Sequence, residues 1–392
     1  MRFNLWEDCN RVPLTELLSF IVDNRGKTVP TAPSGHKLIA TNCVTNNTLF
    51  PVYEKIRYLS EETYQTWFRA HPIPGDILFV NKGTPGQVCL VPDPVDFCIA
   101  QDMIALRADE SKIYPKYLFA VLRSREIQQQ IYNTNVGDVI PHFKKQFLNQ
   151  LLIPIPERSI QESIGDLYYV LSLKAERNKK INDNLQQQAM ALYAEMFLNS
   201  SDNNVTSGTL SDIAVITMGQ SPSGSSYNED GVGEVFYQGR AEFGFRFPKR
   251  RLFTTEPKRM AETGDVLLSV RAPVGDLNVA YESCCIGRGL GAIHSKTGHS
   301  SFVLYTMFAL KSQLDVFNGE GTVFGSINRD ALNAIPIDVP LVTKIDRFEA
   351  VAHPIDELIR TNYEENCRLE AIRDSLLPKL MSGEIDVSAV QL

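Results

Sequence analysis

The sequence predicts an α+β protein that is built twice: a β-rich domain is followed by a long helix, and a second such domain by a second helix. Three observations predict this order. Two long segments carry apolar residues three and four positions apart, as amphipathic helices do. These segments align with each other at a fixed offset of 184 residues, as from Pro156 to Pro340. The stretches before them align as well, and such self-similarity indicates an internal duplication.

The first long helix is predicted from Ile160 to Phe197, a segment without proline that is rich in Leu, Gln, Lys, Glu and Ala. At 1.5 Å per residue it would be roughly 55–60 Å long. Its apolar seam consists of Ile164, Leu167, Leu171, Ile181, Leu185 and Leu192. The second helix repeats the pattern with Phe348, Val351, Ile355, Leu358, Leu369 and Leu376. Narrow seams of this spacing are typical of coiled coils, so we expect the two helices to pack on each other.

The predicted boundaries follow from the duplication. Residues 1–157 form the first domain and 158–198 its helix, and residues 199–341 form the second domain, with the second helix and a C-terminal tail in 342–392. The first domain contains a turn and buried strand at 74–80, another strand from 97 and a helix at 114–132. The second domain repeats these features, because residues 264–275 match 75–86, residues 285–290 match 98–103, and residues 305–312 match 117–124. The offset drifts between these matches, which places insertions in loops.

The composition is that of an ordinary globular protein, with 43% hydrophobic and 22% charged residues among 392. No apolar run approaches the roughly 18 residues that span a membrane, and the N-terminus has charges where a signal peptide needs an apolar core. The seven cysteines form no C-x-x-C pair, which argues against a disulfide framework or zinc site and fits a reducing cytoplasm. The net charge of −7 neither indicates nor excludes nucleic-acid binding, which follows local patches.

Motifs of the common enzyme classes are missing from the sequence. It has no phosphate-binding P-loop, no G-x-S-x-G nucleophile elbow and no H-E-x-x-H zinc helix. It also lacks the Asn/Asp-Pro-Pro-Tyr/Phe run with which amino-methyltransferases hold a base, and its six histidines form no spaced cluster. We therefore expect no catalytic and no metal-binding residues in this chain.

Candidate binding residues are concentrated in the second domain. Residues 249–259, KRRLFTTEPKR, follow a stretch in which Arg240 and Arg246 are interleaved with Phe243, Phe245 and Phe247. Arg and Lys neutralise phosphates, and Arg recognises guanine through two hydrogen bonds. A solvated strand face above core phenylalanines explains the composition equally well, so both interpretations stay open.

Aligned loop positions of the two domains also carry polar residues. Lys82 aligns with Arg271, and Gln101 aligns with Arg288. The segment Gly219-Gln220-Ser221 aligns with Gly26-Lys27-Thr28. Each of these residues, taken singly, is better explained as an ordinary surface residue.

Two asparagines stand at the same place in the two helical seams, Asn178 and Asn362. A buried Asn lowers stability but fixes the register of a helix pair, because an Asn that faces Leu loses its hydrogen bonds. We predict that antiparallel packing brings these two side chains together. The alternative is that both amides face solvent at the edge of the seam.

The duplicated order of domain and helix, together with several short motifs, resembles the specificity (S) subunit of type I restriction–modification systems. The motifs are the GD[IV]L[FL] strands at 75–79 and 264–268 and the proline-terminated apolar runs at 151–156 and 334–340. The loops at 26–28 and 219–222 agree with that family, as does the closing segment 376–385, LLPKLMSGEI. The resemblance covers essentially the whole chain.

This resemblance implies two target recognition domains, each of which recognises one half of a split DNA sequence. It implies that the long helices form an antiparallel coiled coil that sets the spacing between the half-sites. The implied partners are two methyltransferase (modification) subunits, which methylate adenine N6 with S-adenosylmethionine, and restriction subunits, which use ATP and Mg. No cofactor is then expected in this chain, and the expected location is the bacterial or archaeal cytoplasm.

On this interpretation, DNA contacts are expected in loops of both domains. The candidates are Arg25, Lys27, Lys82, Gln101, Lys144, Gln220, Arg240, Arg246, Arg250, Arg251, Arg271 and Arg288. A pseudo-symmetric scaffold that does not bind DNA would explain the duplication, but not the cation–aromatic stretch. A self-sufficient restriction or methylating enzyme would need catalytic motifs that the sequence lacks.

Overall fold

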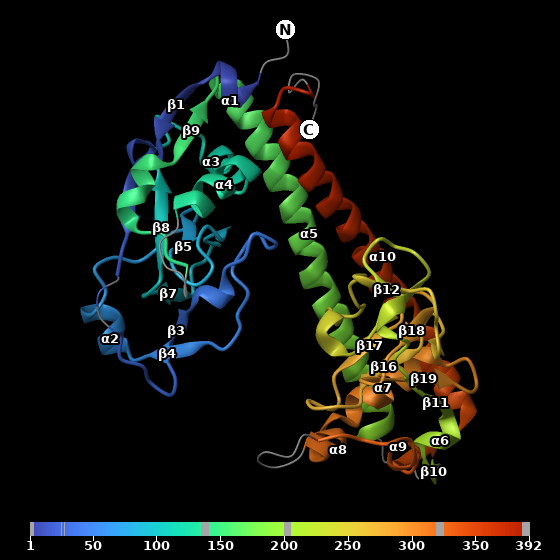
Figure 1. The fold of residues 1–392 in the computed structure, drawn as a ribbon. Coiled ribbons are helices and arrows are strands. Elements are labelled where there is room, and N and C mark those ends of the chain that lie inside the picture. The colour runs from blue at the N-terminus through green and yellow to red at the C-terminus, as the bar shows by residue number, and fades with distance from the viewer. Residues whose placement is uncertain are drawn as a thin grey trace. The chain divides into compact units, whose positions relative to one another are not determined.

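The computed structural model describes residues 4–24, 26, 28–134, 141–199, 205–318 and 325–385 (Figure 1). The chain divides into two compact units. Unit 1 comprises residues 1–180 and 362–392, and unit 2 comprises residues 181–361. The long helices α5 (Arg158–Tyr193) and α10 (Val342–Met381) each contribute to both units. The candidate residues Arg25 and Lys27 lie outside the described residues.

Unit 1 is built on a four-stranded antiparallel sheet with the strand order β2-β8-β5-β6. A three-stranded sheet, β4-β3-β7, contains one parallel pair, β3 with β7, and β1 pairs with β9 in a two-stranded ribbon. The strands are β1 (Asn10–Pro13), β2 (Leu18–Val22), β3 (His36–Ile39), β4 (Arg57–Leu59), β5 (Ile77–Val80), β6 (Val88–Leu90), β7 (Phe97–Ile99), β8 (Met103–Ala108) and β9 (Leu152–Ile155). The shorter helices are α1 (Leu5–Asp8), η1 (Leu14–Leu17), η2 (Thr41–Cys43), α2 (Glu61–Thr66), α3 (Pro115–Leu122), α4 (Arg125–Thr134) and η3 (Lys145–Gln150).

Unit 2 repeats this architecture. Its four-stranded sheet has the order β11-β19-β16-β17, its second sheet contains a parallel pair, β13 with β18, and β10 pairs with β20. The strands are β10 (Val205–Thr209), β11 (Ala214–Met218), β12 (Tyr227–Asn228), β13 (Glu234–Tyr237), β14 (Leu252–Thr254), β15 (Met260–Ala261), β16 (Val266–Ser269), β17 (Leu277–Val279), β18 (Cys284–Ile286), β19 (Leu290–Ser295) and β20 (Pro336–Pro340). The shorter helices are η4 (Ala194–Leu198), α6 (Leu210–Ile213), η5 (Gly224–Ser226), η6 (Arg240–Glu242), α7 (Ser300–Ala309), α8 (Lys311–Asp315), η7 (Val316–Asn318) and α9 (Arg329–Asn333).

The GD[IV]L motifs form the central strands β5 and β16, which are buried on both faces. Ile77 and Phe79 pack in the same cluster as α3, whereas Leu78 and Val80 pack against the second sheet. Successive side chains of a strand point to opposite faces, so this continuous apolar run serves two cores. The register is the same in both units, since Ile77 lies opposite Leu90 and Val266 lies opposite Val279.

The helices α5 and α10 pack antiparallel within each unit. In unit 1, Ile164 and Leu167 line the same small void as Leu377 and Leu380. Asn178 donates from Nδ2 to Asn366 Oδ1 at 3.0 Å and to Glu365 at 2.6 Å. In unit 2, Tyr193 packs edge-on against Phe348, and Asn182 donates to the carbonyl oxygen of Ile359 at 3.2 Å.

The predicted seam residues differ in part from those that the helices bury. Ile181, Val351 and Leu358 are 46%, 50% and 46% exposed, so their assignment to the seam is wrong. Small and polar side chains are buried near them instead, namely Ala175, Asn178, Asn182, Ala352 and Asn366. The buried partner of Asn178 is Asn366 and not Asn362, which is half-buried.

Within the described residues, none of the helices combines the length and the apolar character that crossing a membrane requires.

Candidate nucleic-acid interface

In unit 2, the loops that follow strands β11, β13, β16 and β18 come together at one edge. The Gln220 amide donates to the Ile286 carbonyl at 2.9 Å, and the Arg288 amide donates to Ser221 Oγ at 3.3 Å. The Val270 amide donates to Gly289, and the Ala272 amide donates to Gly325, both at 3.0 Å. We name residues 219–221, 238–239, 270–272, 287–289 and 325–326 loop cluster 2. It places Gln220, Arg271 and Arg288 on one group of loops.

Glycines allow this close approach of backbones. A Cβ atom on Gly219 would lie 2.2 Å from the carbonyl oxygen of Gly287. A Cβ atom on Gly287 would lie 2.8 Å from the Cα atom of Gln238, which is too short for any real contact. Only glycine fits where backbones pass this closely. Gln238, an exposed neighbour of these glycines, was not among the predicted residues, although the run of glycines from 287 to 291 could have indicated a tight loop cluster.

Unit 1 has the same arrangement at the aligned positions. The Asn81 amide donates to the Asp102 carbonyl at 2.7 Å, and the Gly83 amide donates to Pro141 at 3.0 Å. Lys82 forms a β-bridge with His142, as Arg271 does with Ser326. Gln101 Nε2 donates to Thr28 Oγ1 at 3.2 Å. We name residue 28 with residues 81–83, 100–102 and 141–144 loop cluster 1.

The cations of the two loop clusters have no carboxylate partners among the described residues. Lys82 and Lys144 in unit 1 and Arg271 and Arg288 in unit 2 are exposed, and none of them is in an ion pair with a described residue. Lys145, next in sequence, differs because its Nζ atom lies 3.1 Å from Asp23 Oδ2. The clusters therefore present positive charge that is not already matched, which is what a phosphate or a base edge requires.

Comparisons with known proteins show what the chain as a whole is similar to. Residues 23–187 match the family model described as "Type I restriction modification DNA specificity domain". A protein of Methanocaldococcus jannaschii named as the MjaX type I restriction enzyme specificity subunit is 28% identical over 357 residues, which cover 85% of this chain and 84% of that protein. The HindI specificity subunit of Haemophilus influenzae is 22% identical over 398 residues, covering 79% and 86% of the two chains.

A solved structure shows the same fold. The type I restriction–modification S subunit from M. genitalium is 17% identical and superposes with a TM-score of 0.60, over 97% of this chain and 98% of that one. Over most of its length the chain is therefore similar to specificity subunits of type I restriction–modification systems, and residues 23–187 match their DNA specificity domain. The relatives that it matches are named as specificity subunits, which are the non-catalytic members of these systems.

Three exposed arginines of the cation–aromatic stretch are in ion pairs with carboxylates of unit 2. Arg240 pairs with Asp276, and Arg250 pairs with Glu282. Arg251 lies 2.5 Å from Glu242 and 3.4 Å from Glu229. These three arginines are exposed and stay candidates for DNA contact. Their ion pairs within unit 2 favour the interpretation of a solvated surface that the sequence left open.

The prediction of a DNA contact for Arg246 is wrong. Its side chain is 4% exposed, and its guanidinium is held inside unit 2. Nη1 lies 2.8 Å from Asp356 Oδ1, while Nη2 donates to Gln186 at 3.0 Å and to the Tyr305 hydroxyl at 3.3 Å. Burial raises the pKa of Tyr305, so its hydroxyl keeps the proton that it donates to Asp356 at 2.8 Å. Arg246 therefore joins strand β17, whose Val279 amide donates to its carbonyl, to α5 and α10. Its side chain is not accessible to DNA.

No group of three or more His, Cys, Asp or Glu side chains in the described part of the chain is placed to hold a metal ion.

Proposed function

We propose that the chain recognises a split DNA target, with loop cluster 1 contacting one half-site and loop cluster 2 contacting the other. The observation that carries this proposal is the equivalence of the two clusters. The two clusters share two equivalent backbone hydrogen bonds. At the same position each presents a cation, Lys82 or Arg271, that is in no ion pair with a described residue. Two linked sites of modest affinity bind a bipartite target more tightly than either alone, because the second contact is intramolecular.

The long helices are proposed to set the spacing between the half-sites as an antiparallel coiled coil. They have 36 and 40 residues, which at 1.5 Å per residue gives roughly 54 and 60 Å. Two readers that engage the same face of B-DNA need a separation of about 34 Å or a multiple of it. The antiparallel contacts of α5 and α10 within each unit support this role.

Partner subunits are proposed to dock on the outer faces of these helices. Several apolar side chains of α5 and α10 are 39–50% exposed, although the helices pack their other faces. They are Val170 and Ile372 in unit 1 and Ile181, Met190, Val351 and Leu358 in unit 2. Exposed apolar residues on one element are typical of protein interfaces. Two modification subunits with S-adenosylmethionine, and restriction subunits with ATP and Mg, are the proposed partners, while this chain holds no cofactor and works in the cytoplasm of a bacterium or archaeon.

Co-expression with the neighbouring methyltransferase subunit tests the proposal. We expect N6-methyladenine in a split motif across the host genome, mapped by sequencing that detects modified bases. Exchange of residues 209–333 for those of another family member should change one half of the motif only. Methylation that is unchanged when this chain is deleted, with no complex formed, would contradict the proposal and favour a scaffold.

A further inference from the structure

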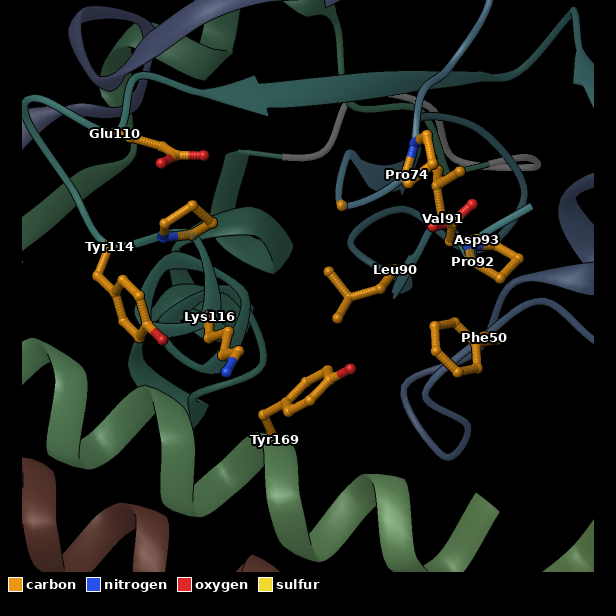
Figure 2. A pocket seen from close by; sticks show the side chains of 12 residues that line it. Phe50, Pro74, Leu90, Val91, Pro92, Asp93, Glu110, Tyr114, Lys116 and Tyr169 are labelled. Carbon is orange, nitrogen blue, oxygen red and sulfur yellow. The ribbon is translucent and has the colours of Figure 1, made fainter. Parts of the chain in front are cut away.

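Unit 1 contains an open crevice between β6, the edge strand of its four-stranded sheet, and helix α5. It has a volume of about 320 Å³. In Figure 2, Tyr169 projects from α5 toward Leu90, with Tyr114 and Lys116 on one side and Phe50 on the other. Three prolines complete a largely apolar wall, and the carboxylates of Asp93 and Glu110 stand at its rim. We name this space crevice 1.

Unit 2 has a much smaller space at the same position of the repeat, which we name crevice 2. It has a volume of about 60 Å³. Its lining residues Gly264, Val279, Leu304 and His353 align with Gly75, Leu90, Lys116 and Tyr169 of crevice 1. The two crevices are therefore equivalent parts of the two units.

The chain itself fills crevice 2 with an arginine. The Val279 amide donates to the Arg246 carbonyl at 2.8 Å, and the Leu90 amide donates to the Leu49 carbonyl at the same distance. These equivalent bonds identify Leu49 as the counterpart of Arg246. The carboxylate that Arg246 binds, Asp356, is likewise replaced by Ser172 in unit 1.

A second carboxylate shows the same difference. Glu282 of unit 2 pairs with Arg250, from the segment that carries Arg246. Its counterpart in unit 1 is Asp93, which forms no ion pair with any described residue. The corresponding segment of unit 1, Leu49 to Tyr53, contains no cation. Unit 1 thus keeps one of the acidic positions but has no arginine at the positions that correspond to Arg246 and Arg250.

The electrostatics of crevice 1 favour a cation from outside. Lys116 Nζ lies 2.6 Å from Asp166 Oδ1 and 4.5 Å from the centre of the Tyr169 ring. Burial is the largest single influence and disfavours both charges. The hydrogen bonds of the two groups with each other and with Tyr114, together with their mutual attraction, outweigh it, so the pKa of Lys116 is raised and that of Asp166 is lowered. The lysine charge is therefore already matched, which leaves the carboxylates of Asp93 and Glu110 unbalanced.

An arginine side chain suits this combination of groups better than other cations. Its planar guanidinium forms paired hydrogen bonds with carboxylates such as those of Asp93 and Glu110. The centres of the Tyr114, Tyr169 and Phe50 rings already lie 4.9, 4.5 and 5.7 Å from Arg158 Cζ, Lys116 Nζ and Lys180 Nζ, so the carboxylates and not the rings are the partners that the crevice offers. Its aliphatic stem packs on apolar walls while the charged end reaches the rim. A nucleic acid would meet two unpaired carboxylates here, and their repulsion of phosphates argues against it.

We propose that crevice 1 is a docking site for an arginine-bearing, otherwise apolar segment of a partner polypeptide, which in the assembly proposed above is the modification subunit. This inference rests on the proposed function. It assigns to unit 1 a contact that unit 2 makes within its own chain.

Charge reversal at the rim tests the proposal without disturbing the core. The full chain carrying Asp93→Lys and Glu110→Lys is titrated with the co-expressed, purified modification subunit, and Kd is measured by calorimetry. We expect Kd to rise at least about tenfold, since like charges would face each other. The matched control carries Glu62→Lys and Glu126→Lys, two carboxylates of unit 1 outside the crevice that form no ion pair with a described residue. Its Kd should stay within about twofold of the wild type.

The outcomes separate this inference from the function on which it rests. If the charge-reversed chain keeps the thermal unfolding of the wild type, binds the modification subunit with the wild-type Kd and supports methylation, the docking site is wrong and the proposed function stands. If the wild-type chain does not bind that subunit, both are wrong. If the charge reversals instead abolish self-association of the chain, a second copy occupies the crevice and the proposal is overturned.

Discussion

The two units have one backbone plan but hold it together with different chemistry. At the junction between sheet and helices, unit 1 has Leu49 and Ser172 where unit 2 has Arg246 and Asp356. At the edge of the main sheet, Asp76 pairs with Arg107 in unit 1, whereas the equivalent Asp265 pairs with His294 in unit 2.

This comparison shows which features the fold requires. The strand order of the four-stranded sheet, the register of the β5–β6 and β16–β17 pairs, and two backbone hydrogen bonds of each loop cluster are the same in both units. The two members of an ionic contact differ together between the units, as Arg246 with Asp356 and Leu49 with Ser172 do. A buried arginine without its carboxylate would destabilise the fold far more than two uncharged side chains. The side-chain contacts that stabilise each unit can therefore change without changing the backbone of the loop clusters.

The largest expected effect is at the buried ion pair of unit 2. Arg246→Ala leaves Asp356 without its cation, and breaking a buried pair on one side typically lowers stability by about 3–5 kcal/mol. Urea unfolding, followed with hydrogen exchange of unit 2, measures the loss. The double variant Arg246→Leu with Asp356→Ser copies unit 1 and should recover much of it. A double variant less stable than Arg246→Ala would show that the two junctions are not interchangeable.

An intermediate effect is expected at the equivalent cations of the loop clusters. Arg271→Ala should weaken binding to the second half-site only, and Lys82→Ala to the first half-site only. Loss of one phosphate or base contact lowers binding by about 1–3 kcal/mol. Fluorescence anisotropy with probes in which one half-site is scrambled measures both. An equal loss for Arg271→Ala on a probe with a scrambled second half-site would show that its contact is nonspecific.

The smallest expected effect is on how the free energy of unfolding depends on pH, through the pair formed by Asp265 and His294. Burial raises the pKa of Asp265, against hydrogen bonds from the Glu262 amide and His294. Because this pKa in the folded state exceeds that in the unfolded state, the stability contributed by Asp265 is present below about pH 3.9 and is lost as the pH rises through the folded pKa.

His294→Arg should reduce that loss, since arginine stays charged and favours the ionised carboxylate. Unit 1 has an arginine at this position, Arg107, which donates two hydrogen bonds to Asp76. Because His294 is half exposed, the gain above the folded pKa of Asp265 should be about 1 kcal/mol or less. Thermal unfolding of both proteins between pH 3 and 8 measures it. A variant that loses as much stability as the wild type over this range would contradict this explanation.

Much of the local structure was predictable because it depends on neighbouring residues. The GD[IV]L motifs mark β5 and β16, and the alignment of Lys82 with Arg271 and of Gln101 with Arg288 correctly placed these residues on equivalent loops. The apolar periodicity indicated α5 and α10. Such signals are carried by residues close in sequence, where helix and strand periods act.

The roles of the arginines could not be predicted, because they depend on contacts between residues far apart in sequence. Arg246 and Asp356 are separated by 110 residues, and Arg240 and Asp276 by 36. The same holds for Asn178, whose partner Asn366 follows from the axial offset of the two helices and not from the aligned position of Asn362. Apolar spacing also could not show that Ala175 and Asn182 are buried while Ile181 faces solvent.

The two-stranded ribbons have a consequence for how such genes change. Strand β1 pairs with β9 along four residues, and β10 pairs with β20 along five, so the chain enters and leaves each β-rich region at one narrow neck. A coding segment cut at both strands of a neck encodes a closed module. In-frame recombination at these points would replace a whole module and disturb only one short ladder of hydrogen bonds.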